Sequence, residues 1–180
     1  MKRIEITLTF AAMICVLAWL DFYICLIFLL CIVIHELGHL AAMKLLKIPC
    51  GCIRIGIAGA RIDARFPSYE KELLCALSGP LFGAIFALFF VHWMPKAAVI
   101  SITLSLINLL PLYPLDGGRI VKAALCIYVA EDKAERMVCI LSAVACCVLM
   151  GAACWAAVQW QTGLWPIFAS LVLLCRVGRD

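Results

Sequence analysis

Charged residues are scarce in this sequence. Asp, Glu, Lys and Arg together make up 14% of its 180 residues, whereas about 25% is usual in soluble domains. Hydrophobic residues make up 67%, well above the share of about one half in such domains. The composition therefore excludes an ordinary soluble domain and indicates a protein whose surroundings are mostly lipid.

Signals of several other protein classes are missing as well. There is no block of basic residues and no basic stretch interleaved with aromatic residues, so we expect no nucleic-acid partner. The first apolar run, Ile4–Leu20, lacks a clear small-x-small cleavage site, which favours a retained helix over a signal peptide. We find no internal repeat and no low-complexity segment. At this length we predict a single domain, residues 1–180.

Cysteine is abundant, but its placement does not indicate a disulfide scaffold. Most of the twelve cysteines lie within apolar runs, where a thiol behaves as a small hydrophobic side chain. Cys50 and Cys52 are the one close pair with polar neighbours. No partner ligands accompany them, so we favour an ordinary structural role over a metal or redox site.

Long apolar runs predict an all-α polytopic membrane protein. A helix needs about 20 apolar residues to cross the hydrocarbon core of a bilayer. Six runs approach this length, of which the first is a little short and the last clearly short. We therefore expect about six transmembrane helices, at Ile4–Leu20, Phe22–Met43, Glu72–Val91, Ala97–Leu115, Met137–Val158 and Gly163–Cys175.

The basic residues and the tryptophans predict how these helices are oriented. If both termini are cytoplasmic, fourteen of the fifteen Lys and Arg residues lie on the cytoplasmic side and only Lys96 lies outside, as the positive-inside rule requires. Tryptophan favours the membrane interface. All five tryptophans fall at the outer ends of the predicted helices or in the last outer loop: Trp19, Trp93, Trp155, Trp160 and Trp165.

One segment, from Ile48 to Tyr69, does not have the pattern of a helix. Isoleucines alternate with other residues over Ile53–Ile57, and a second alternation covers Arg61–Arg65. A period of two is typical of strands, so these residues indicate a short β-hairpin at the cytoplasmic face. An irregular amphipathic loop fits the pattern about equally well.

Polar residues inside an apolar helix are costly and usually functional. The second run contains His35, Glu36 and His39. Residues four apart share one face of a helix, so the two histidines can bind one metal ion. Glu36 lies about 100° around the helix from His35, where it can take a proton from a water molecule beside the metal.

Two histidines leave a catalytic zinc short of a third protein ligand. Asp116 is the candidate, because it follows Pro111 and Pro114, which should break the fourth helix. Unwound backbone at membrane depth is tolerated only where protein or a water-filled cavity surrounds it, so such a break itself indicates a site. In the predicted topology Asp116 and His39 both lie near the cytoplasmic leaflet. Arg119 is close enough in sequence to interact with Asp116.

These residues carry a resemblance to a known family. The pentad at residues 35–39 and the stretch from Asn108 through Pro111 to Asp116 and Gly117 resemble the paired motifs of the site-2 protease family of intramembrane metalloproteases. A weaker Gly-x-x-x-Gly feature matches Gly79 to Gly83, where helix packing explains the glycines at least as well as catalysis. The resemblance covers about residues 22–120, which would be a three-helix catalytic core, with 4–20 and 137–175 as accessory helices.

The resemblance implies a function for each of these residues. His35, His39 and Asp116 would bind one zinc ion, and Glu36 would be the general base. Asn108 would be a catalytic helper that contacts substrate or the developing oxyanion, although a hydrogen bond between helices would also explain it. The strand at Ile53–Ile57 would be an edge that pairs with unfolded substrate. The predicted activity is that of a zinc metalloendopeptidase; the alternative is a zinc-binding membrane protein without protease activity, such as a metal carrier or an inactive scaffold.

The layout is closest to the sporulation branch of this family, which processes a membrane-associated pro-sigma factor. We expect neither the C-terminal CBS domain of that branch nor the PDZ insert of the stress-response branch within these 180 residues. The expected partners are the bilayer and a membrane-associated protein substrate, such as a pro-sigma or anti-sigma factor. Regulatory membrane partners or a homo-oligomer stay open. The expected location is the cell membrane.

Overall fold

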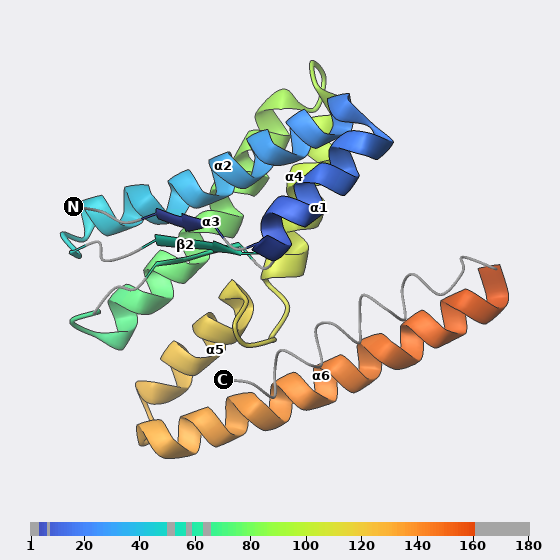
Figure 1. Cartoon of the computed structure of the whole chain (residues 1–180). Helices are drawn as coiled ribbons and strands as arrows, with labels where there is room; N and C mark the ends of the chain where they lie inside the picture. Colours follow the sequence, from blue (N-terminus) through green and yellow to red (C-terminus); the bar gives the residue numbers. More distant parts are fainter. Residues whose placement is uncertain (1–3, 7, 50–52, 57–58, 63–65, 161–180) are drawn as a thin grey trace.

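A computed structural model describes residues 4–6, 8–49, 53–56, 59–62 and 66–160. These ranges contain three short strands and six helices, shown in Figure 1. In chain order they are β1 (Ile4–Ile6), α1 (Leu8–Leu20), α2 (Phe22–Leu45), β2 (Ile53–Gly56), β3 (Gly59–Ile62), α3 (Tyr69–Phe90), α4 (Pro95–Asn108), α5 (Asp116–Cys126) and α6 (Glu131–Trp160).

Three of the described helices are long and apolar enough to cross a membrane. They are α2, α3 and the Glu131–Trp155 part of α6. With 24 residues, α2 is about 36 Å long, which exceeds the hydrocarbon core of about 30 Å. The predicted second span is thus a helix of spanning length, and the third and fifth predicted spans lie almost wholly within α3 and α6. These helices support a multi-pass membrane protein.

The boundary between α1 and α2 is set by a capping residue. The Asp21 carboxylate accepts hydrogen bonds from the backbone N–H groups of Tyr23 and Ile24, at 2.9 and 3.1 Å. The first N–H groups of a helix have no partner within the helix, and Asp is among the best residues for satisfying them. One acidic residue between two apolar runs therefore starts a new helix.

Helices α2, α3 and α4 pack closely through small residues. A Cβ added at Gly38 of α2 would lie 2.6 Å from the Ser78 carbonyl oxygen of α3. At the next contact, Ser101 of α4 donates a hydrogen bond of 2.9 Å to the Gly83 carbonyl of α3. Small residues let membrane helices approach in this way. The crossing brings the middle of α2 against the middle of α3.

The predicted fourth span, Ala97–Leu115, is too long. Helix α4 ends at Asn108, residues 109–115 are not helical, and Asp116 is the first residue of α5 rather than the last residue of a span. The prolines explain the difference: Pro111 has no N–H for a helical hydrogen bond and its ring disfavours a helical residue before it. The break therefore begins before Pro111, about two turns ahead of Asp116.

Two predictions about the N-terminal half are also wrong. Residues Ile4–Ile6 form β1 instead of the start of a helix, and β1 pairs parallel with β2, with Ile4 opposite Ile53. On its other side β2 pairs antiparallel with β3, with Gly56 opposite Gly59. The strand order is β1-β2-β3. The strand predicted as a free edge at Ile53–Ile57 is therefore the central one over its described residues.

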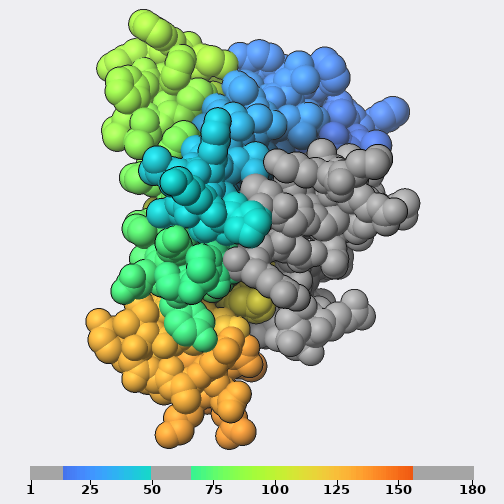
Figure 2. All heavy atoms as spheres, turned by 90° about the vertical axis from the view of Figure 1, so that its left-hand side faces the viewer, coloured from blue at the N-terminus to red at the C-terminus, as the bar shows by residue number. Residues whose placement is uncertain are grey.

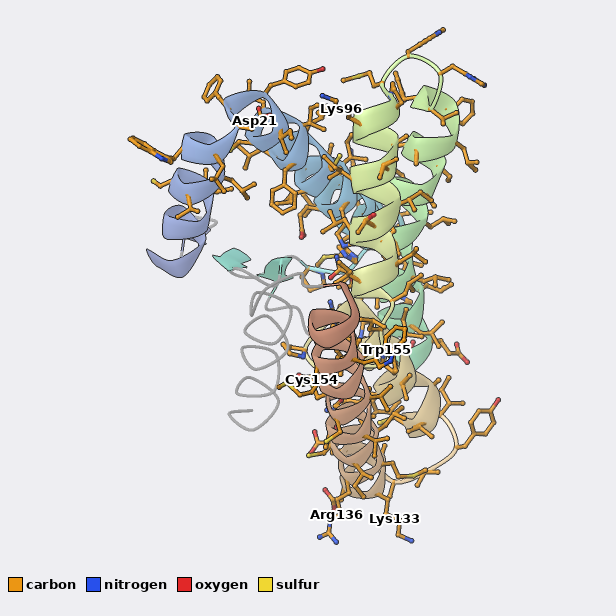
Figure 3. The ribbon with its side chains drawn as sticks, turned by 90° about the vertical axis from the view of Figure 1, so that its right-hand side faces the viewer. Asp21, Lys96, Lys133, Arg136, Cys154 and Trp155 are labelled. Atoms are coloured by element: carbon orange, nitrogen blue, oxygen red, sulfur yellow. The ribbon has the colours of Figure 1, made fainter. Side chains whose placement is uncertain are left out.

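Charged residues lie at both ends of the helical body. Asp21 and Lys96 lie at one end, while Lys133 and Arg136 lie at the other (Figure 3). Figure 2, which shows the opposite face, has the α3–α4 turn at the top and the start of α6 at the bottom. The predicted last span at Gly163–Cys175, and both Cys50 and Cys52, lie outside the described residues.

Candidate metal centre

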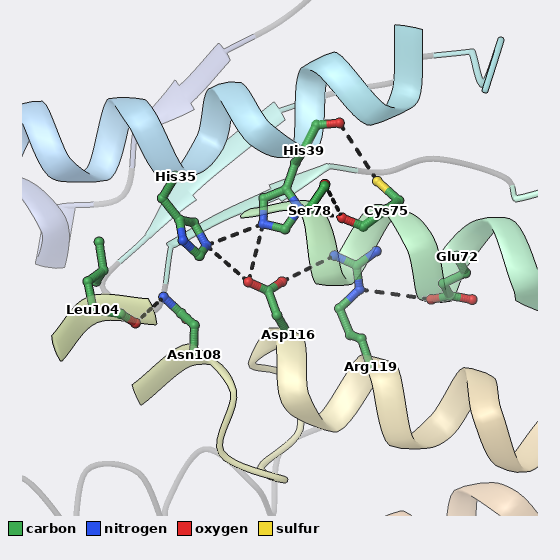
Figure 4. Close-up of polar contacts among 9 residues, drawn as sticks. All are labelled: His35, His39, Glu72, Cys75, Ser78, Leu104, Asn108, Asp116 and Arg119. Atoms are coloured by element: carbon green, nitrogen blue, oxygen red, sulfur yellow. Dashed lines mark hydrogen bonds and ion pairs between the residues drawn. The ribbon is translucent and has the colours of Figure 1, made fainter. Parts of the chain in front are cut away.

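The three predicted ligands meet in one buried place. His35 and His39 lie one turn apart on α2, and each is 4% exposed. The Asp116 Oδ2 atom lies 3.0 Å from His35 Nε2 and 3.2 Å from His39 Nε2, and the two Nε2 atoms are 3.3 Å apart (Figure 4). Asp116 lies 81 and 77 positions after the two histidines in sequence, yet the three residues present their ligand atoms to one point.

The spacing of these atoms fits a small metal ion. Donors around a tetrahedral zinc, at bond lengths of about 2.0–2.1 Å, are about 3.3–3.5 Å apart. The observed separations are 3.0–3.3 Å. Two imidazole nitrogens and one carboxylate oxygen are also a typical donor set of a catalytic site that keeps a further position for water. The site can thus hold a metal ion.

A backbone carbonyl sets the orientation of one histidine ring. His39 Nδ1 lies 2.8 Å from the Cys75 carbonyl oxygen on α3. A carbonyl only accepts hydrogen bonds, so the proton of the neutral ring is on Nδ1 and the lone pair of Nε2 faces the site. Ser78 donates a second hydrogen bond of 2.6 Å to the same carbonyl. Sequence analysis missed this contact, because any residue type supplies a carbonyl.

The other histidine lacks such a support among the described residues. His35 Nδ1 is buried without a hydrogen-bond partner there. Its ring orientation rests instead on its contact with Asp116 and its edge-on contact with the His39 ring, whose centroid is 5.0 Å away. Within the described structure the two proposed ligands on α2 therefore differ in how firmly they are held.

Gly79 provides the space for the histidine rings. A Cβ at this position would overlap His39 Nε2, and it would lie 2.5 Å from His39 Cε1 and 2.9 Å from His35 Nε2. The role of this glycine is thus steric: it lets α3 approach α2 so closely that the rings touch backbone. This contact supports the packing interpretation of Gly79, and the groups packed against Gly79 are the rings of two candidate metal ligands.

Asp116 is placed by the chain before it and after it. Leu112 and Leu115, which precede it, are 1% and 4% exposed and pack against Cys146 of α6. Gly117, which follows it, has no room for a side chain, because a Cβ would overlap the carbonyl oxygens of Leu109 and Leu110. The backbone of residues 109–115 thus lies against the first turn of α5.

Arg119 contacts the carboxylate oxygen of Asp116 that faces away from the histidines. Its guanidinium lies 3.8 Å from Asp116 Oδ1 and 3.9 Å from Glu72 Oε1 on α3 (Figure 4). The predicted proximity of Arg119 to Asp116 is therefore present, whereas the link to Glu72 was not foreseen. An ion pair on Oδ1 favours a carboxylate that keeps Oδ2 for the histidine side.

Glu36 and Asn108 lie between the predicted ligands in sequence. Glu36 is half-buried and follows His35 on α2. Asn108 is the last residue of α4, and its Nδ2 donates a hydrogen bond of 3.1 Å to the Leu104 carbonyl. Both His35 and Asn108 lie thirteen residues after the start of their helices, a rise of about 20 Å. The end of α4 and the middle of α2 are therefore at similar depth.

The sequence and the fold are similar to those of known proteins. Residues 90–152 match the family model described as Peptidase family M50, and this segment contains Asp116. The fold is similar to that of the structure described as Site-2 Protease from Methanocaldococcus jannaschii, with a TM-score of 0.69 and 21% sequence identity over 98% of this chain and 89% of that chain. No curated protein matches the sequence.

Residues 90–152 are thus similar to a peptidase family, and the fold is similar to that of a site-2 protease. Both findings agree with the resemblance to the site-2 protease family that the motifs predicted. The matched segment covers the half of the site that contains Asp116, while the histidine half comes from α2, outside that segment.

Proposed function

We propose that the protein is an intramembrane zinc endopeptidase that cleaves a membrane-associated or membrane-spanning protein. Residues 1–180 would form one domain with a catalytic core at about 22–120. The observation that carries the proposal is the convergence of His35 Nε2, His39 Nε2 and Asp116 Oδ2 within 3.3 Å of one another in a buried place. The family match supports the same chemistry.

In this proposal each residue has one task. His35, His39 and Asp116 hold the ion, and bound zinc supplies polarisation of the scissile carbonyl and a lower pKa for water. Glu36 accepts a proton from the attacking water and passes it to the leaving amine nitrogen. Asn108 contacts the developing oxyanion, since a primary amide has a second N–H besides the one on the Leu104 carbonyl.

The site would lie near the cytoplasmic leaflet, with both termini in the cytoplasm. The distribution of Lys and Arg supports this orientation, and so does the place of Lys133 and Arg136 at the end opposite Lys96. His39 lies six residues before the end of α2, about 9 Å from it. In a topology with six crossings, the first five crossings would be made by α1, α2, α3, α4 and α6.

The substrate would have to lose its helical structure before cleavage, because helical peptide bonds are shielded and already hydrogen-bonded. Addition of the substrate as a strand to the small sheet would supply partners for its backbone. Since β2 has a neighbour on each side, the pairing edge would belong to β1 or β3. A pro-sigma or anti-sigma factor with a membrane-associated segment fits this requirement.

Replacement of the proposed base separates proteolysis from zinc binding. In Glu36→Gln we expect the zinc content to stay at the wild-type level and cleavage to be lost. The substrate can be found by comparing the membrane proteomes of cells that express the wild type and Glu36→Gln, and cleavage is then measured in reconstituted membranes. Glu70→Gln, at an exposed position in the first turn of α3, is the matched control.

The outcomes discriminate between the functions. Unchanged cleavage by Glu36→Gln would exclude Glu36 as the base. Zinc bound to the wild type without any change in the membrane proteome would favour a carrier or a scaffold. In Asp116→Ala we expect the loss of both zinc and cleavage, and full zinc occupancy in this variant would remove Asp116 from the ligand set.

A further inference from the structure

The chain between α4 and α5 satisfies only some of its backbone groups by itself, through hydrogen bonds such as Leu112 N to the Leu110 carbonyl and Leu115 N to the Leu112 carbonyl. It is not helical, and in a membrane unpartnered backbone groups are costly. Helix α6 supplies partners for two of them. Tyr113 N donates a hydrogen bond of 3.0 Å to Ser142 Oγ, and Ser142 Oγ donates one of 3.4 Å to the Pro111 carbonyl. Ser142 is completely buried, with 0% exposure.

This contact lies close to the metal centre along the chain. Tyr113 is three residues before Asp116, and its backbone nitrogen touches the first turn of α5. A Cβ at Gly118 would lie only 2.5 Å from Tyr113 N. There is thus little free space between the bonded backbone and α5, and a displacement of Tyr113 would be passed to Gly118 and Asp116.

An apolar contact accompanies the polar one. Cys146 lies one turn further along α6, is 1% exposed and packs against Leu112 and Leu115. Two side chains of similar size on one face of α6 therefore contact the chain between α4 and α5: Ser142 through its hydroxyl and Cys146 through its thiol. This pair allows hydrogen bonding to be separated from packing by experiment.

We propose that Ser142 is a positioning residue for the metal centre, which acts on Asp116 through the backbone of Pro111 and Tyr113. The inference rests on the proposed function, because the group to be positioned is a zinc ligand. It makes α6 a part of the catalytic unit, although the motifs lie within residues 22–120 and predicted α6 to be an accessory helix.

The test compares Ser142→Ala with Cys146→Ala in the full-length protein in detergent. The dissociation constant for zinc is measured by competition with a chelator, and the ligand geometry by the absorption spectrum of the cobalt-substituted protein. We expect Ser142→Ala to weaken zinc binding by about tenfold or more, as for loss of other supporting contacts around metal ligands, and to alter the cobalt spectrum. Cys146→Ala should stay within about twofold of the wild type, and Ser142→Thr, which keeps the hydroxyl, should restore most of the affinity.

Wild-type affinity and spectrum in Ser142→Ala would overturn the inference, and so would an equal loss in Cys146→Ala, which would assign the effect to packing. If Ser142→Ala does not fold, Ser142→Cys takes its place, because a thiol fills the space of the hydroxyl but forms only weak hydrogen bonds. Wild-type zinc affinity in Ser142→Cys would also overturn the inference. Failure of the wild type to bind zinc would instead refute the proposed function, so the two failures can be told apart.

Discussion

The most direct test of the site geometry is the substitution Gly79→Ala. It adds one methyl group to α3 at the point where α3 meets the two histidine rings. The new carbon would overlap His39 Nε2, lie 2.5 Å from His39 Cε1 and lie 2.9 Å from His35 Nε2. Carbon atoms in ordinary contact are about 3.5–4.0 Å apart, so the His39 ring must withdraw by roughly 1 Å.

A shift of this size is large for a metal site. Metal–ligand distances are held within about 0.2 Å, and a displacement of about 1 Å at a reacting centre can reduce the rate about 100-fold. A factor of 100 corresponds to about 2.7 kcal/mol. We therefore expect Gly79→Ala to reduce the rate of cleavage by about 100-fold and to weaken zinc binding.

The assay is competition with a zinc chelator in detergent, with thermal unfolding of the same samples as a check on folding. Gly83→Ala is the matched control: it lies one turn along α3, where a Cβ would overlap Ser105 Oγ and lie 3.3 Å from Ser101 Oγ, away from the ligands. Both variants should lose stability by about 1–3 kcal/mol through overpacking. If zinc binds equally well to both, the steric reasoning about Gly79 is wrong.

Two further substitutions test other contacts. Arg119→Gln should weaken zinc binding about tenfold, because Asp116 Oδ1 loses its ion pair. The control is Lys122→Gln, one turn further along α5, which should leave the chelator titration unchanged. Equal effects of the two substitutions would indicate a general effect of charge. Asp21→Ala should lower the free energy of unfolding by about 0.5–2 kcal/mol through loss of the helix cap, with no change in zinc affinity. Asp21→Asn keeps a capping oxygen and should stay near the wild-type melting temperature, and a loss as large as that of Asp21→Ala would argue against the cap.

The candidate ligands could be predicted because their pattern is local and chemically rare. Two histidines four apart in an apolar helix have few explanations, and an aspartate after two prolines adds a third donor. The supports around them could not be predicted in this way. The Cys75 contact uses a backbone carbonyl, which every residue has, so no sequence pattern marks it. Ser142 is one of several small residues on α6. Only the fold shows that the Cys75 carbonyl contacts His39 and that Ser142 contacts the backbone that precedes Asp116.

The boundaries of the elements were predicted less well than their existence. The end of α4 depends on how far Pro111 acts backward along the chain, and the composition of Ala97–Leu115 is apolar throughout. Residues 4–6 continue an apolar run, so only their pairing with Ile53–Ile55 distinguishes a strand from a helix. Such pairing is a long-range contact that local periodicity does not contain.

The early end of α4 has a consequence for the supply of water. Hydrolysis consumes one water molecule for each peptide bond, and the bilayer interior provides none. Because α4 stops at the depth of His35, the polar helix α5 begins beside the candidate ligands. Two ion pairs lie along it, one between Asp116 and Arg119 and one between Lys122 and the exposed Glu135. We expect the hydrolytic water to follow this charged route, so that a lipid-facing substrate and its second reactant would reach the metal from different directions.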